Sequence, residues 1–394
     1  MTKVRTGLDV LVAQEFAPLR GLRIGLVTHP AAVDEQLHQA IELFAEAPGV
    51  TLAAIFGPEH GLLGQAQDLA AVAGGDAKKI AVPVHSLYGE TVESLRPTAE
   101  QLNGLDALVI DLQDIGSRYY TFQATMQYCL QAALPRGMLV LVLDRPNPLG
   151  GTAIEGPAVR KGFESFVGAH DLATRHGLTI GELAMLYQRE LDLDRGELRV
   201  ISCEHWKRAR YFDETGLPWV LPSPNMPTLD TALVYPGQCL LEGTNLSEGR
   251  GTTRPFELCG APWLDAASLV RRMNEEKLAG VRFRAAWFRP TFQKHAGQDC
   301  GGVQLHITDR EAFQPVRTSL ALLAAMREMS GSHFAWRTEP YEFVRDPIAI
   351  DLLFGSARER THLEAGRSWR ELVPIWTKEE TAFAQRRHTA LLYD

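Results

Sequence analysis

Four hydrophobic runs in the first half of the chain each end in polar residues. They cover residues 23–28, 51–56, 106–110 and 138–143. Short apolar runs of this kind are typical of strands buried on both faces of a parallel sheet. Stretches with helical spacing of apolar residues lie between them, which predicts right-handed βαβ units and a parallel sheet.

The polar residues that follow these runs carry the main functional signal. In an open parallel sheet, ligands bind in the crevice outside the carboxyl ends of the strands. We therefore expect one site, assembled from four loops at this edge of the sheet. The residues concerned are His29; Glu59 and His60; Asp111, Gln113, Asp114, Arg118, Tyr119 and Tyr120; and Asp144, Arg145 and Asn147.

A proline-rich stretch predicts the domain boundary. Residues 221–228 contain three prolines, which excludes a regular helix or strand there. We expect an α/β fold with a Rossmann-like, mostly parallel sheet domain over residues 1–228. A second, smaller α+β domain is expected over residues 229–394, closing the cleft.

Local signals predict several further elements. Asp34 is expected to cap a helix over residues 35–47, and Pro83 favours an edge position for a short strand over residues 79–85. Capping boxes, in which a Ser or Thr is followed three residues later by Glu or Gln, predict helix starts. The other expected helices cover residues 117–134, 265–277 and 316–329, the strands lie near 198–202, 281–287 and 303–308, and the boxes are Thr98/Gln101, Thr179/Glu182, Ser368/Glu371 and Thr377/Glu380.

Composition narrows the class of protein. The net charge of −8 argues against a nucleic-acid or anionic-membrane partner. The five scattered cysteines include no C-x-x-C pair, so we expect neither a disulfide framework nor a zinc site. No apolar run approaches the roughly 20 residues of a membrane-spanning helix, and the first residues lack the apolar segment of a signal peptide. We therefore expect a cytoplasmic protein without membrane insertion.

Known cofactor and catalytic motifs are missing. The first strand is followed by Thr28-His-Pro-Ala-Ala32 instead of the glycine-rich dinucleotide fingerprint, and there is no P-loop, H-E-x-x-H or G-x-S-x-G motif. We expect neither a cofactor nor a bound metal. Arginine, tyrosine and asparagine beside carboxylates suit a sugar, whose hydroxyls need many hydrogen bonds and whose ring faces stack on aromatic side chains.

Glu59 is the first candidate for catalysis. It lies in Gly57-Pro-Glu-His-Gly61, where glycine and proline impose an irregular backbone. A carboxyl held against apolar neighbours can act as a general acid. The alternative is that Glu59 only caps the next helix. His60 could orient Glu59 or bind substrate, or it could be structural.

The other clusters also allow two interpretations. Asp111, Asp114 and Arg118 could bind a sugar or form a helix cap with an Asp–Arg pair. Tyr119 and Tyr120 could form a stacking platform or belong to the core. The long loop over residues 242–257 is functional or an interdomain hinge; its candidate residues are Asn245, Glu248, Arg250 and Thr252.

Taken together, these motifs resemble a known family, the exo-β-N-acetylmuramidases of the NamZ type. The resemblance implies release of N-acetylmuramic acid from the non-reducing ends of peptidoglycan fragments, with the family's catalytic glutamate at Glu59. Two segments depart from the family pattern, His29-Pro-Ala-Ala32 and Leu62-Leu63. The matching segments are Phe56-Gly-Pro-Glu-His-Gly61, Val84-His-Ser-Leu-Tyr-Gly89, residues 109–122, Asp144-Arg-Pro-Asn-Pro-Leu-Gly-Gly151, Ser223-Pro-Asn-Met-Pro-Thr228 and residues 242–253.

The mechanism that follows has one open step. Glu59 would protonate the leaving oxygen, while Asp114, Glu248 or the sugar's own 2-acetamido group assists from the opposite face. Arg118, Arg145 or Arg250 could bind the lactyl carboxylate of muramic acid. The remaining polar residues of the motifs are expected to contact the sugar; these are Asp111, Gln113, Asp144, Asn147, Asn225, Asn245 and Thr252.

Two other classes of protein remain as alternatives. A two-domain α/β chain with a polar cleft could bind an amino sugar or muropeptide without cleaving it. Alternatively, His29, His60, Asp111 and Asp114 could form a metal-dependent hydrolase site, although their spacing matches no known ligand pattern.

Overall fold

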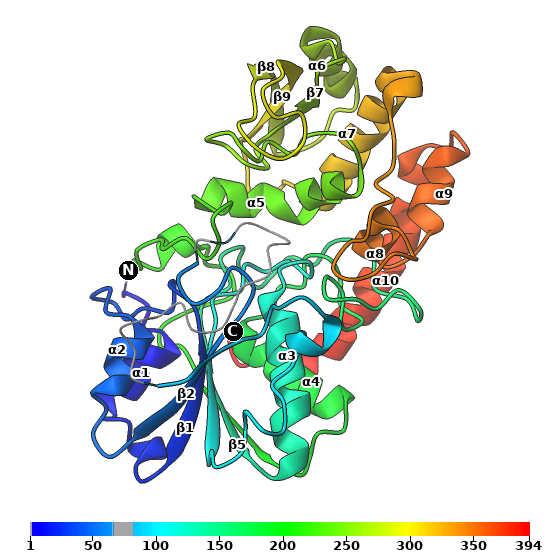
Figure 1. Cartoon of the computed structure of the whole chain (residues 1–394). Helices are drawn as coiled ribbons and strands as arrows, with labels where there is room; N and C mark the ends of the chain where they lie inside the picture. The colour runs from blue at the N-terminus through cyan, green and yellow to red at the C-terminus, as the bar shows by residue number, and fades with distance from the viewer. Residues whose placement is uncertain (1, 65, 67–81) are drawn as a thin grey trace.

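Six parallel strands form the sheet of the first domain, in the order β3-β2-β1-β4-β5-β6 (Figure 1). The computed structural model describes residues 2–64, 66 and 82–394. This strand order is that of dinucleotide-binding folds, and it reverses between β1 and β4. The predicted parallel sheet is confirmed. Its strands are β1 (Arg23–Thr28), β2 (Thr51–Gly57), β3 (Val84–Ser86), β4 (Ala107–Asp111), β5 (Leu139–Leu143) and β6 (Glu197–Ile201).

Helices cover both faces of this sheet, as the continuous apolar character of the strands requires. In β4, Val109 joins the hydrophobic cluster on the side of the first two helices, whereas Ile110 joins the cluster on the opposite side. Figure 1 shows the two helical layers on either side of the strands. The helices are α1 (Gly7–Ala13) and α2 (Ala40–Ala45) on one face, and α3 (Phe122–Ala133) and α4 (Ile180–Glu190) on the other.

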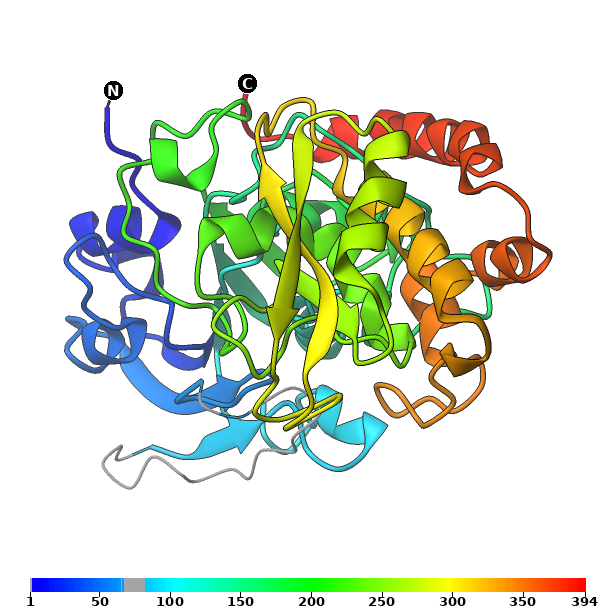
Figure 2. The ribbon, with the colours of Figure 1, turned by 90° about the horizontal axis from the view of Figure 1, so that it is seen from above.

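The second domain contains a three-stranded antiparallel sheet in the order β7-β9-β8. Seen from above, β8 and β9 lie over the middle of the molecule, with helices beside them (Figure 2). The smaller α+β domain is therefore confirmed. Its elements are α5 (Leu229–Gln238), β7 (Leu258–Ala261), α6 (Ala266–Glu275), β8 (Val281–Phe288), β9 (Cys300–Ile307) and α7 (Pro315–Ser330).

The last part of the chain returns to the first domain. Arg387 donates a hydrogen bond to the carbonyl of His176 at 3.0 Å, and the backbone N–H of Leu392 donates to Glu182 at 2.8 Å. One hydrophobic cluster includes residues from both domains. The boundary between residues 228 and 229 therefore stays a prediction. The returning helices are α8 (Ala349–Phe354), α9 (Arg358–Glu364) and α10 (Val373–Arg387).

Two predicted helix starts are wrong. Asp34 accepts hydrogen bonds from the backbone of Gln36 and His38 and so closes a turn, in which Leu37 has a φ of 71°. The helix that follows begins only at residue 40. Thr377 lies inside α10, where its hydroxyl bonds to the carbonyl four residues earlier, so it caps nothing.

Other local predictions hold in part. The capping box of Thr179 and Glu182 is present at the start of α4. The hydrogen bonds of the Thr98/Gln101 box are present as well, but they hold a turn and not a helix. The predicted helix over residues 117–134 starts later, at residue 122. The predicted strand over residues 79–85 is seen as β3, an edge strand, and residues 79–81 lie outside the described residues.

Within the described part of the chain, no helix combines the length and apolar character needed to cross a bilayer.

Candidate active site

A pocket of about 470 Å³ lies where the loops of the parallel sheet meet the second domain. It is lined by residues that follow β2, β4 and β5, by the 221–228 stretch and by three segments of the second domain. The predicted convergence of separate loops is therefore seen for part of the candidate set. The lining residues are Glu59, His60, Tyr119, Tyr120, Thr121, Val167, Ser223, Asn225, Tyr235, Glu242, Arg250, Phe256, Tyr341 and Glu342.

Glu59 is a buried carboxyl at this pocket, two residues beyond the end of β2. Its side chain is held by Thr121, whose hydroxyl donates a 2.6 Å hydrogen bond to Oε2. Only 6% of Glu59 is exposed. The next residue, His60, has a φ of 70°, and its Nδ1 donates to the carbonyl of Ala66 at 2.8 Å. These contacts hold both side chains in the lining of the pocket.

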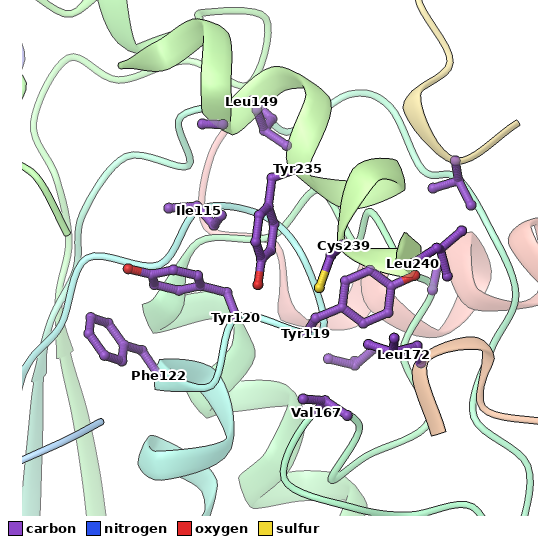
Figure 3. Close-up of a cluster of buried hydrophobic side chains, with 14 of the residues drawn as sticks. Ile115, Tyr119, Tyr120, Phe122, Leu149, Val167, Leu172, Tyr235, Cys239 and Leu240 are labelled. Carbon is purple, nitrogen blue, oxygen red and sulfur yellow. The ribbon is translucent and has the colours of Figure 1, made fainter. Parts of the chain in front are cut away.

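Three tyrosines form an aromatic part of the lining. Figure 3 shows Tyr235 of α5 reaching down between Tyr119 and Tyr120, which precede α3. The rings of Tyr120 and Tyr235 lie 6.1 Å apart in an edge-to-face arrangement. Burial raises the pKa of Tyr119 and that of Tyr120 above their usual values, so both hydroxyls stay protonated at neutral pH. All three tyrosines also belong to the main buried hydrophobic cluster, so the interpretation of Tyr119 and Tyr120 as core residues holds alongside their place in the lining.

Two charged residues of the second domain, Glu242 and Arg250, also line the pocket. Arg250 donates to Glu242 at 2.7 Å and to Glu248 at 3.4 Å, and it lies over the ring of Phe256. Lys294 donates to Glu248 at 2.9 Å. Burial alone would raise the pKa of Glu248, but Lys294 and Arg250 outweigh it, and the pKa is lowered. Glu248 is therefore a buried counter-ion, and it is not among the lining residues.

Asp111 and Arg145 form a buried ion pair instead of facing this pocket. Arg145 donates to both carboxylate oxygens of Asp111 and also to the carbonyl of Val33. Arg145 and Gln113 line a second pocket, of about 380 Å³, at the point where the strand order reverses. These candidates thus lie together, but apart from Glu59.

Asp114 and Arg118 hold the loop that carries the tyrosines. Asp114 accepts a 2.6 Å hydrogen bond from the backbone of Gly116 and lies 3.3 Å from Nε2 of His176. Arg118 is fully buried and donates to three carbonyl groups, those of Pro157, Leu172 and Leu353. Neither residue lines the pocket.

Four further candidates also lie outside the lining and bond to other parts of the protein. Asp144 accepts hydrogen bonds from Thr179 and the backbone of Gly181. Asn147 bonds to the backbone of residues 149 and 178, and Asn245 to that of residues 333 and 335. Thr252 bonds to the backbone of residues 249 and 254. The bonds of Thr252 are local and stabilise a turn, whereas those of Asp144 and Asn245 join segments far apart in the sequence.

Several lining residues were not among the sequence candidates. Glu242 and Thr121 lie inside the motifs identified in the sequence. Their place next to candidate residues was the only sequence signal for them. Tyr235, Tyr341 and Glu342 lie in segments without any functional pattern. Among the described residues, no group of three or more histidines, cysteines, aspartates or glutamates could hold a metal ion.

The fold and the pocket define a two-domain α/β protein with buried carboxylates and tyrosines at an interdomain site, as a carbohydrate-active enzyme needs. Residues 24–230 match the N-terminal domain of the exo-β-N-acetylmuramidase NamZ family and residues 233–393 match its C-terminal domain. The chain belongs to this family, which confirms the resemblance.

Individual relatives agree with this assignment. The chain is 44% identical, over 99% of its length and 92% of the relative's, to the peptidoglycan β-N-acetylmuramidase NamZ of Bacillus subtilis. Two crystal structures of DUF1343 family proteins from Bacteroides fragilis are similar. One has a TM-score of 0.89 at 33% identity and covers both chains fully. The other has a TM-score of 0.76 at 26% identity and covers 100% of this chain and 99% of its own.

Proposed function

We propose that this chain is a glycoside hydrolase that releases terminal N-acetylmuramic acid from the non-reducing ends of peptidoglycan fragments. Family membership and the named activity of the Bacillus subtilis relative support this activity. The observation that carries the proposal for the site is the buried Glu59, which faces a pocket lined by tyrosines, Asn225 and Arg250.

Glu59 is the proposed general acid. It donates a proton to the glycosidic oxygen as the bond to the anomeric carbon breaks through an oxocarbenium-like state. Its hydrogen bond from Thr121 fixes one carboxyl oxygen, which leaves the other for the leaving group. His60, anchored through Ala66, supports the loop that carries Glu59.

For the opposite face of the sugar we propose the substrate's own 2-acetamido group. Asp114 is bonded to its own loop, and Glu248 is bonded to Lys294 and Arg250. Glu242 lines the pocket but already accepts hydrogen bonds from Arg250 and Tyr341. This assignment predicts net retention at the anomeric carbon, which proton NMR of the first product detects.

Arg250 is the proposed reader of the lactyl carboxylate. It is the one of the three candidate arginines that lines the pocket, and a guanidinium can bind a carboxylate through two parallel hydrogen bonds. Tyr119, Tyr120 and Asn225 are the proposed contacts to the ring and hydroxyls. The ligand proposed is thus an acidic amino sugar.

The test is hydrolysis of para-nitrophenyl N-acetylmuramide by Glu59→Gln. Loss of a general acid lowers the rate on the order of 100- to 10,000-fold. The matched control is Glu100→Gln, the same change at an exposed position. Activity of Glu59→Gln near that of wild type would remove Glu59 from the role. Sugar binding by a wild-type protein without hydrolysis would favour the binding-protein alternative, and activity abolished by a chelator would favour the metal-dependent one.

The cytoplasmic location and the absence of a nucleic-acid partner stay predictions. Cell fractionation with an antibody against the chain tests the first, and electrophoretic mobility of labelled nucleic acid tests the second.

A further inference from the structure

A strained turn near residue 342 forms part of the pocket. Glu342 and Phe343 both have positive φ, of 47° and 68°. Their neighbours Tyr341 and Val344 exchange two backbone hydrogen bonds, of 2.8 and 2.9 Å. Two left-handed residues between such a pair are the mark of a type I′ hairpin, which favours Asn-Gly or Gly-Gly. A Glu-Phe pair costs free energy there, because a Cβ opposes positive φ.

Side-chain contacts hold this hairpin between the two domains. Tyr341 donates a 2.7 Å hydrogen bond to Glu242 of the second domain. Tyr88, which follows β3 in the first domain, donates a 3.0 Å hydrogen bond to Glu342. The ring of Phe343 packs against Tyr88 with 5.6 Å between centroids. The hairpin is therefore held by both domains, and its tip carries the buried carboxyl group of Glu342.

This arrangement places Glu342 in the proposed sugar site. Tyr341 and Glu342 both line the pocket that contains Glu59. The oxygen atoms of a carboxyl group can accept hydrogen bonds, and a sugar offers hydroxyl donors. Glu and Phe both disfavour the positive φ that they adopt at this pocket. Strained backbone of this kind is typical of functional sites.

We infer that the hairpin closes the pocket beyond the terminal sugar and that Glu342 accepts a hydrogen bond from the 4-hydroxyl of that sugar. The inference rests on the proposed function. A terminal N-acetylmuramic acid has this hydroxyl free, whereas an internal one carries the next sugar on the same oxygen. The 4-oxygen of an internal unit has no proton to donate, and we expect the sugar attached to it to collide with the hairpin. Glu342 is thus a specificity residue that selects chain ends.

A double-mutant design tests the contact. The substrates are para-nitrophenyl N-acetylmuramide and its 4-deoxy analogue, and the variant is Glu342→Met, which keeps the length of the side chain. We expect each single change to lower kcat/KM about 10- to 100-fold, because it leaves a buried polar group without its hydrogen-bond partner. Combining the two changes adds no further loss, because the same contact is removed. Losses that multiply would overturn the inference.

Two controls separate this contact from general damage. Glu339→Met makes the same change at an exposed position three residues earlier and leaves kcat/KM unchanged. Glu342→Gln keeps one acceptor oxygen. We expect it to be more active than Glu342→Met with para-nitrophenyl N-acetylmuramide, but not with the 4-deoxy analogue. Equal loss by Glu342→Gln with both substrates would assign Glu342 a merely structural role.

Binding measurements test the Glu342 contact independently of the proposed hydrolase activity. Titration calorimetry with N-acetylmuramic acid and its 4-deoxy form compares the same two proteins and the same change in the sugar, without any hydrolysis. We expect the deoxy sugar to bind 10- to 100-fold more weakly to wild type and equally weakly to Glu342→Met. If wild type bound the sugars in this way but hydrolysed no glycoside, the proposed hydrolase would fail and the Glu342 contact would stand. Equal affinity of wild type for the two sugars would overturn the contact, whatever the hydrolytic activity.

Discussion

The hydroxyl of Thr121 donates a 2.6 Å hydrogen bond to Oε2 of Glu59, joining the loop after β4 to the loop after β2. Both residues are buried at the interdomain pocket. The bond fixes the rotation of the carboxyl group, and orientation of a catalytic group within a fraction of an ångström decides much of its effect. Thr121 is thus a positioning residue for the proposed acid.

Removal of this donor is expected to slow catalysis without weakening substrate binding. Thr121→Val keeps the shape but not the hydroxyl, and we expect kcat to fall about 10-fold with KM unchanged. Thr121→Ser keeps the donor and should retain most of the activity. Initial rates with para-nitrophenyl N-acetylmuramide measure both. A Ser variant as impaired as the Val variant would show that packing of the methyl group matters instead.

The Asp111–Arg145 pair is expected to act on stability more than on catalysis. Asp111→Leu leaves the guanidinium of Arg145 buried without its partner, which typically costs about 3–5 kcal/mol in the free energy of unfolding. Asp111→Leu combined with Arg145→Met removes both charges and should be less destabilised than Asp111→Leu alone. Urea denaturation measures these changes. A large fall in kcat/KM of the folded double variant would instead show that the Asp111–Arg145 pair takes part in substrate binding or catalysis.

The sequence located Glu59 and the two tyrosines for a physical reason. In a parallel sheet all strands end at the same edge, so the loops after β2 and β4 must meet there. The loop that carries Arg250 was found because its polar composition and length are unusual for a compact domain. These signals are local, or follow directly from the topology.

The rest of the site depends on packing that no local pattern encodes. Glu342 reaches the pocket only because the second domain folds over the sheet, 254 residues along the chain from its partner Tyr88. Asp111 and Asp144 look like site residues in the sequence, because a structural carboxylate and a catalytic one use the same side chain. Likewise, the helix expected from residue 35 starts late because Asp34 and Leu37 form a turn first.

Glu155 is expected to make stability depend on pH. Burial raises its pKa to about 7, and its Oε2 has no hydrogen-bond partner among the described residues. The folded state therefore holds this proton more tightly than the unfolded state does. Protonated Glu155 therefore adds to the free energy of unfolding. This contribution is complete below about pH 4 and is lost as the pH rises through about 7.

The variant Glu155→Gln removes this titration. We expect wild type to lose on the order of 3 kcal/mol more than the variant in its free energy of unfolding between pH 4 and pH 8, since a pKa unit corresponds to about 1.4 kcal/mol. Denaturant titrations at both pH values give the difference. Parallel losses in the two proteins would show that Glu155 titrates alike in the folded and unfolded states.

Arg250 is expected to determine preference for muramic acid over glucosamine. Arg250→Met removes the proposed partner of the lactyl carboxylate, so kcat/KM for para-nitrophenyl N-acetylmuramide should fall about 10- to 100-fold. The N-acetylglucosaminide lacks that carboxylate and should be affected much less. Lys294→Met is the control, because it also removes a cation from Glu248 but lies outside the lining of the pocket. Equal losses on both glycosides would mean that Arg250 acts only by holding Glu242 in place, since that ion pair is present whichever sugar is bound.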